Sequence, residues 1–337
     1  MKIPAALALA VATILAASPT VPAHAAPEPA GPLKVMPLGD SITYGSGSAD
    51  SRIGNRTGAP TASGYRIDLQ KRLGAAGLNV DFVGSQQAGP KGADRDHEGH
   101  PGWRIDQIAA NVDTWLATYQ PDVILLHLGT NDMAQNKSVD PTATRLSTLI
   151  DQIRAGRPDA DIFVQQLVQG HIEPYKSRIA AYNKRIPGIV AGKDDKVHLV
   201  DQSSIGGLSE FDQLHPNDDG YAKMAYNLYR AMTKVYGDAG WPAGRNPYAG
   251  TATTLCFRIN KTVAGRPDWH SECSRWTLRA GRWQRPGTAT QTYLLHIKAR
   301  VVTAKARKVV VKDRYLKRTR VVTTWLSDDP YLTNAGK

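Results

Sequence analysis

Short apolar runs alternate with amphipathic stretches along the chain between Leu33 and Gly237. Such alternation is typical of a parallel sheet whose strands are joined by helices. We therefore expect a three-layer α/β fold in which a five-stranded, mainly parallel sheet has helices on both faces, as in flavodoxin-like proteins. The runs that we interpret as buried strands are residues 34–38, 80–84, 123–128, 162–167 and 197–200.

Helical spacing marks three stretches between and after these runs. Apolar residues recur every three or four positions over residues 105–116, 146–153 and 221–232, which is the period of one helix face. Either Asn217 or Asp218 could cap the last of these helices.

Two segments lack both patterns. Residues 45–63 follow the first strand and are rich in Gly, Ser and Thr, so we expect a long loop of the kind that shapes substrate sites. Residues 237–250 contain Pro242, Pro247 and four glycines, a composition that indicates a linker. The expected organisation is an α/β domain over residues 26–236, a linker over 237–250 and a second domain over 251–337.

The second domain differs from the first in its pattern and its charge. Stretches rich in β-branched and aromatic residues at 292–302, 308–314 and 319–326 predict a small antiparallel β module. Residues 251–337 hold 18 Lys and Arg against 5 Asp and Glu, a net charge of +13, which leaves −1 for the rest of the chain. This charge favours extracellular anionic polymers as partners, although a basic module that only adds solubility is an equal alternative. No nucleic-acid motif is recognised, so we expect no nucleic-acid partner.

The first 25 residues have the pattern of a removable export signal. Lys2 precedes the apolar residues 3–17, and the small-x-small triplet 23–25 follows them. A membrane anchor is the alternative, but the apolar run is shorter than the roughly 20 residues that span a bilayer. We therefore expect a secreted, extracellular protein with no membrane-spanning segment.

The two cysteines of the chain, Cys256 and Cys273, both lie in the basic module. Because export places them in an oxidising compartment, a single disulfide is expected. Two unpaired thiols remain the alternative.

The first chemical candidate is Ser41, in the Gly-Asp-Ser triplet that ends the first predicted strand. Open α/β sheets bind ligands at the carboxyl edge of the sheet, where this serine would lie. The triplet is also common turn chemistry, so it carries little weight alone.

Asp212 and His215 follow the last predicted strand and precede the last helix. Ester hydrolysis by a serine needs a base for its proton and a carboxylate that holds the imidazole in the correct tautomer. The two residues could supply both functions. Alternatively, Asp212 only caps the helix and His215 is a surface histidine.

Two further candidates could stabilise an oxyanion. Asn131 lies in Gly-Thr-Asn-Asp directly after the third predicted strand, where its amide could donate to the developing charge. Gly102 lies in Gly-His-Pro-Gly-Trp before a predicted helix, and its backbone N–H is free of side-chain obstruction.

These four elements, in this order, resemble the signature of the SGNH hydrolase (GDSL) superfamily over about residues 33–236. The resemblance implies that Ser41 is the nucleophile, His215 the base and Asp212 the orienting carboxylate. It also implies an oxyanion hole formed by the Ser41 N–H, the Gly102 N–H and the Asn131 side chain, with no cofactor and no metal. The local sequences around Ser41, Gly102 and His215 are similar to the branch of secreted acetyl xylan esterases, which implies acetylated polysaccharides as substrates.

Two other functions remain open. A lipase or phospholipase would use the same residues on a longer acyl chain, but it would need an extended apolar groove, of which the polar loop 45–63 gives no sign. In a non-catalytic protein the basic module would bind an anionic surface and the α/β domain would be only a scaffold. The complete set of signature residues argues against this second alternative.

Overall fold

The computed structural model describes most of the chain between Gly31 and Gly250 and separate strands beyond it. Residues 1–25, interpreted as the export signal, lie outside the described residues, and so do residues 52–59 of the long loop. The described ranges are 31–51, 60–170, 173–206, 209–237, 240–250, 252–263, 266–279, 282–284, 293–295, 300–302, 308–313 and 318–323.

A central sheet of seven strands has the order β3-β4-β1-β5-β6-β7, with β2 also paired to β1. Every neighbouring pair is parallel except β3 with β4. The five expected strands are therefore confirmed as parallel neighbours, and the short strands β3 and β4 are additions. The bounds are β1 Leu33–Gly39, β2 Val80–Phe82, β3 Gln86–Gln87, β4 Asp96–Gly99, β5 Val123–His127, β6 Asp161–Gln165 and β7 Val197–Val200.

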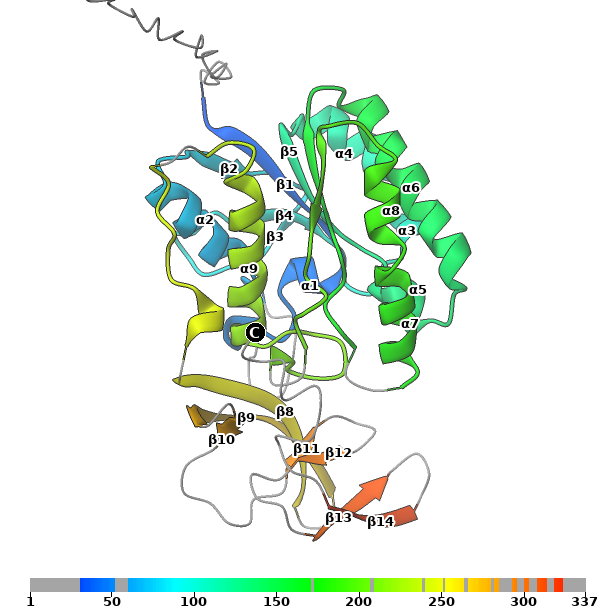
Figure 1. Ribbon diagram of the computed structural model, residues 1–337, viewed down its shortest axis with the longest axis vertical. Helices are drawn as coiled ribbons and strands as arrows, with labels where there is room; N and C mark the ends of the chain where they lie inside the picture. The colour runs from blue at the N-terminus through cyan, green and yellow to red at the C-terminus, as the bar shows by residue number, and fades with distance from the viewer. Residues whose placement is uncertain are drawn as a thin grey trace, which may run out of the picture. The chain divides into compact units, whose positions relative to one another are not determined.

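Helices cover both faces of this sheet, as expected (Figure 1). Successive strand residues point to opposite faces, so Met36 and Leu38 of β1 enter one core while Leu33 and Val35 enter the other. The first core lies under α3, α4 and α6–α8, and the second lies under α2 and α9. The helices are α1 Ser41–Tyr44, α2 Arg66–Ala75, α3 Ile105–Ala109, α4 Val112–Tyr119, α5 Thr130–Ala134, α6 Val139–Gly156, α7 Tyr175–Asn183, α8 Ile186–Ala191 and α9 Asp218–Met232, with one-turn 3-10 helices η1 Ala49–Ser51 and η3 Pro247–Ala249.

Two helix boundaries refine the sequence interpretation. The helical spacing over residues 105–116 is divided between α3 and α4, because the Asn111 side chain donates to the Gln107 carbonyl at 2.8 Å and closes the first helix. The N-cap of α9 is Asn217, whose side chain accepts the Gly220 N–H at 3.1 Å. No helix in the described part of the chain is long and apolar enough to cross a bilayer.

The described part of the expected linker, residues 240–250, lies along α9. Trp241 stacks on Tyr229 with ring centroids 5.8 Å apart, and the Tyr229 hydroxyl donates to the Pro242 carbonyl at 2.5 Å. Further along, Asn227 donates to the Tyr248 hydroxyl at 2.9 Å. These contacts fasten the segment to the α/β domain, and its role as a domain boundary stays a prediction.

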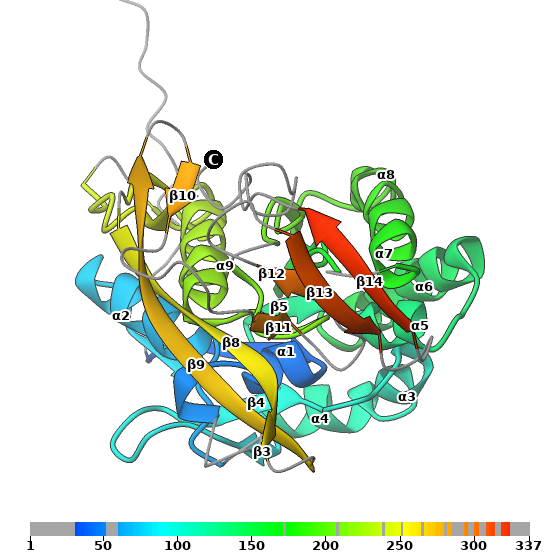
Figure 2. The ribbon, with the colours of Figure 1, turned by 90° about the horizontal axis from the view of Figure 1, so that it is seen from below.

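The strands beyond Gly250 pair in antiparallel fashion (Figure 2). The expected strand region 292–302 is a pair of short strands, and the strands that cover 252–284 were not expected from the sequence. In the register of β8 and β9, Cys256 lies directly opposite Cys273. The bounds are β8 Ala252–Val263, β9 Arg266–Arg279, β10 Arg282–Gln284, β11 Tyr293–Leu295, β12 Arg300–Val302, β13 Lys308–Asp313 and β14 Arg318–Thr323.

Candidate active site

Ser41 is the first residue of α1, at the carboxyl edge of the sheet. Asp40 caps this helix by accepting the Ile42 N–H at 2.9 Å. The tight strand-to-helix turn requires glycine at position 39, because a Cβ there would collide with the His127 carbonyl oxygen of the neighbouring strand. Since the first N–H groups of a helix have no partner in a preceding turn, the Ser41 N–H belongs to the set that can donate to a substrate oxygen.

Ser41, His215 and Asp212 form a continuous hydrogen-bonded chain. Ser41 Oγ lies 2.9 Å from His215 Nε2, and His215 Nδ1 lies 2.9 and 3.0 Å from the two carboxylate oxygens of Asp212. The Asp212 carboxylate also accepts the backbone N–H groups of Leu214 and His215, each at 3.0 Å. The loop before α9 therefore holds both residues in a fixed relation, although Ser41 lies 174 positions away in the chain.

The ionisation of Asp212 determines the tautomer of His215. Burial alone would raise the pKa of Asp212, but the charge of His215 and the hydrogen bonds that the carboxylate accepts outweigh burial and hold the pKa well below its usual range. The ionised carboxylate can only accept, so Nδ1 carries the proton that it receives. The lone pair of Nε2 then faces the hydroxyl of Ser41, which is the arrangement a general base needs.

The two oxyanion candidates meet at the same edge. The Asn131 amide donates to the Trp103 carbonyl at 2.9 Å, and this carbonyl adjoins Gly102. The loop that carries Gly102 is anchored beside β1, because the His100 N–H donates to the Gly39 carbonyl at 2.9 Å. An amide has two hydrogens, so Asn131 keeps one for a second acceptor.

A family model matches this region of the chain. The GDSL-like Lipase/Acylhydrolase family matches residues 38–223, a span that includes Ser41, Asn131 and His215. The chain belongs to this family. The fold and the family expected from the sequence are thus confirmed.

Named relatives of this GDSL-like chain include esterases. A multidomain esterase of Ruminococcus flavefaciens is 32% identical over 260 residues, which are 66% of this chain and 31% of that protein, so the chain spans about a third of its length. A solved family 3 carbohydrate esterase of Clostridium thermocellum is 40% identical, with a TM-score of 0.51, over 61% of this chain and 98% of its own. A solved acetyl esterase mutant with an acetate ion is 27% identical, with a TM-score of 0.52, over 62% of this chain and 100% of its own.

Sequence reasoning assigned no role to Asp132, which follows Asn131 in the GDSL-like signature. Asp132 is fully buried and accepts the Ile105 N–H at the start of α3 at 3.1 Å. Arg145 on α6 donates to its other oxygen at 3.3 Å. The Asp132 side chain therefore fixes α5 against α3. The position of Asp132 directly after Asn131 in the sequence was the signal that could have indicated this supporting role.

Two histidines support the loop that precedes Gly102: His97 Nδ1 accepts the Gly99 N–H at 3.0 Å, and the His100 N–H donates to the Gly39 carbonyl. Burial, helped by the charge of Arg66, lowers the pKa of His97 to about 2, so this imidazole is neutral. The His100 ring stacks on both Trp103 and Trp115, with ring centroids 4.2 and 4.8 Å apart. No group of His, Cys, Asp and Glu side chains in the described part of the chain is arranged to hold a metal ion.

A buried arginine supports the loop after α1. Arg66 has no exposed surface, and burial lowers its pKa to about 10, so the guanidinium stays charged at neutral pH. A cation in a protein interior needs compensating hydrogen bonds. Arg66 donates to five backbone carbonyls, those of Thr43, Tyr44, Ala62, Ala88 and Arg95.

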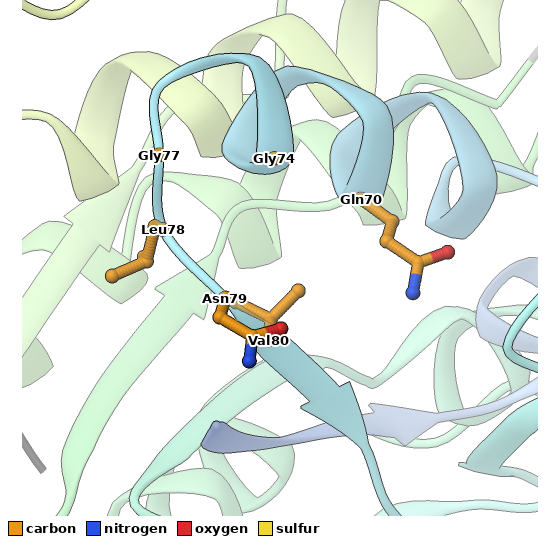
Figure 3. A pocket seen from close by; sticks show the side chains of 6 residues that line it. All are labelled: Gln70, Gly74, Gly77, Leu78, Asn79 and Val80. Atoms are coloured by element: carbon orange, nitrogen blue, oxygen red, sulfur yellow. The ribbon is translucent and has the colours of Figure 1, made fainter. Parts of the chain in front are cut away.

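A separate cavity of about 270 Å³ lies between the end of α2 and the start of β2 (Figure 3). The amino end of β2 is at the edge of the parallel sheet opposite to Ser41. The side chains around the cavity carry no ionisable group, so it offers no acid, base or nucleophile to the site described above. Its lining residues are Gln70, Gly74, Gly77, Leu78, Asn79 and Val80.

Proposed function

We propose that this protein is a serine ester hydrolase that removes short acyl groups, acetyl above all, from polysaccharides. The observation that carries the proposal is the hydrogen-bonded chain from Ser41 through His215 to Asp212. Membership of the GDSL-like family and the named carbohydrate and acetyl esterases among its relatives support the substrate class.

In the proposed reaction, Ser41 Oγ attacks the ester carbonyl while His215 Nε2 accepts the serine proton. The oxyanion accepts hydrogen bonds from the Ser41 N–H, the Gly102 N–H and the Asn131 amide, which are stronger in the transition state than in the ground state. His215 then gives its proton to the departing alcohol. A water molecule activated by His215 hydrolyses the acyl ester on Ser41 and releases the acid. No cofactor enters these steps.

The extracellular setting of the proposal rests on the sequence of residues 1–25. In an oxidising compartment the opposed positions of Cys256 and Cys273 in the β8–β9 register favour one disulfide between them. The basic residues of 251–337 would then meet anionic wall polymers or acidic polysaccharides.

The test is the rate of hydrolysis by the wild type and by Ser41→Ala across p-nitrophenyl esters from acetate to palmitate, followed by acetylated xylan. We expect Ser41→Ala to lose about 10⁴-fold or more in kcat with an unchanged fold, because removal of a triad member has costs of this order. The wild type should act fastest on acetate and lose activity beyond about four carbons. Full activity of a folded Ser41→Ala would exclude the mechanism, and a maximum at palmitate would favour a lipase.

A further inference from the structure

Gly102 itself has little packing within its turn. Gly102 is exposed with a φ of +84°, and a Cβ placed on it would meet nothing within 4 Å. The backbone bond from the Trp103 N–H to the His100 carbonyl, at 3.1 Å, closes the turn from one side. His100 and Trp103 are held by ring stacking, but the exposed Gly102 between them has no close packing, so the position of its peptide depends on hydrogen bonds from outside the turn.

Side chains of α5 and of the residue that ends it supply these bonds. As described above, Asn131 holds the Trp103 carbonyl and Asp132 holds the Ile105 N–H. Gln135, one helical turn after Asn131, donates from Nε2 to the Gly102 carbonyl at 3.4 Å. Its Oε1 accepts from the Arg104 guanidinium at 2.8 Å. The α5 segment thus contacts four consecutive residues, 102 to 105.

Arg104 is also fixed from its other side. Its Nε and Nη2 both donate to the Asp106 carboxylate at 2.9 Å. The charge of the guanidinium is therefore paired with Asp106, and its orientation is fixed. It serves as an anchor for Gln135 and is unsuited to attract an anionic substrate.

We propose that Gln135 is a positioning residue that fixes the Gly102 turn in register with the Asn131 amide. This inference rests on the proposed function, in which both groups donate to the oxyanion. Gln135 touches no reacting atom. It connects the Gly102 turn to the helix of Asn131, so that the Gly102 N–H and the Asn131 amide keep the same relative position when charge develops on the substrate oxygen. Pre-organised donors of this kind contribute only if they do not have to reorganise during the reaction.

The experiment compares Gln135→Ala, Gln135→Glu and Gln152→Ala in the full chain with p-nitrophenyl acetate as substrate. Gln152 is a matched control, because its amide donates to the Ala109 carbonyl at 3.0 Å on a different pair of helices. We expect Gln135→Ala to lower kcat about five-fold, the effect of one modest hydrogen bond, with KM within about two-fold of wild type. Gln152→Ala should keep both values.

Gln135→Glu separates the two contacts of this side chain. Glutamate retains the acceptor for Arg104 but cannot donate to the Gly102 carbonyl, so kcat should fall at least as far as in Gln135→Ala. Wild-type kcat in Gln135→Glu would overturn the proposal, because only the Arg104 contact would then matter. When Asn131→Ala is already present, adding Gln135→Ala should lower kcat by less than about two-fold further. The effects of neighbouring groups that act together are not additive. A full further loss would also overturn it.

Hydrogen exchange gives a readout that does not depend on catalysis. The amides of residues 102–105 should exchange faster in Gln135→Ala than in wild type and Gln152→Ala, because the turn loses an outside bond. Unchanged exchange there would overturn the proposal, whatever the activity. If Ser41→Ala retained full hydrolysis, the proposed function would fail while the exchange result still decided the role of Gln135.

Discussion

At the scale of single residues, two buried aspartates near His215 have opposite pKa shifts. Burial raises the pKa of Asp40 to about 6, although the hydrogen bond from the Ile42 N–H and the charge of His215 act to lower it. The pKa of Asp212 is instead well below its usual range, because its attraction to His215 outweighs burial. The difference follows from the partners: Asp212 shares a bidentate contact with the imidazole, whereas one oxygen of Asp40 has no hydrogen-bond partner among the described residues.

Asp40→Asn should therefore stabilise the protein at neutral pH. An aspartate in the unfolded chain has a pKa of about 3.9, so between about pH 4 and 6 the folded state holds a proton that the unfolded chain has lost. The contribution of Asp40 to stability accordingly decreases as pH rises through this window and is level above it. Asparagine keeps an oxygen for the Ile42 N–H and removes the charge.

The measurement is urea unfolding of the wild type and Asp40→Asn at several pH values. Above pH 6 we expect the variant to have a free energy of unfolding about 1–3 kcal/mol higher than the wild type, and the gap should shrink toward pH 4. A gap that does not change with pH would show that ionisation of Asp40 is not its cause.

At the scale of elements, the loop after α1 packs tightly against the first turn of α9 and the loop that precedes it. The Tyr221 hydroxyl donates to the Ser46 carbonyl at 2.6 Å, and the Ala49 N–H donates to Asp218 at 2.7 Å. Between these bonds, Gly47 has a φ of +96° and lies so close to the other loop that a Cβ would come within 2.5 Å of the Pro216 carbonyl and 3.0 Å of the His215 Cβ.

Gly47→Ala should consequently lower activity as well as stability. The added methyl group would push on the backbone that carries His215, so we expect kcat to fall about ten-fold or more, since small displacements of catalytic groups have large effects. Gly77→Ala is the control: its φ of +82° gives similar backbone strain, but a Cβ there meets nothing within 4 Å. It should lose about 1 kcal/mol of stability and keep its kcat. Equal kcat in the two variants would show that the contact between Gly47 and the loop of His215 does not matter for activity.

The sequence could predict those elements whose signal is apolar. The five parallel strands and the helices α3, α4, α6 and α9 follow from runs and spacings of apolar residues, whereas α2, α7 and α8 were not predicted. The loops of Ser41 and His215 were predicted because they follow strands of this sheet. Strand β4 gave no such signal, because its sequence is Asp-His-Glu-Gly and the side chains that it buries are polar. Glu98, for example, accepts both the N–H and the hydroxyl of Ser85, at 2.7 and 2.6 Å.

Supporting residues could not be predicted for a similar reason. Arg66 and Gln135 act through backbone carbonyls that are distant in sequence, and any residue type supplies a carbonyl, so no motif marks the partner. Ser41 and Asn131 were predictable because each lies in a short motif at a strand end, and Asp212 and His215 because they form a short motif just before the last helix.

At the scale of the whole molecule, the basic module is expected to act as an electrostatic anchor. Residues 26–250 and 26–337 should be compared in pull-downs with anionic and neutral insoluble glycans at low and high salt. The shorter version ends after Gly250 because Trp241 and Tyr248 pack on α9. We expect retention of only the longer version, only on anionic glycans, and its loss near 1 M salt, where charges are screened beyond about 3 Å. Equal retention of both versions would exclude an anchor.

The order of the sheet has a consequence for how this protein acquires activity. Ser41 follows the first strand of the chain and His215 follows the last strand of the same parallel sheet, 174 positions later. Contacts between such distant segments form late, because the chain entropy of closing the loop must be overcome first. An intermediate that lacks β7 would therefore contain the proposed nucleophile, Ser41, without its proposed base, His215. During refolding, ester hydrolysis should return after helical structure has formed, so activity would report on completion of the entire α/β domain.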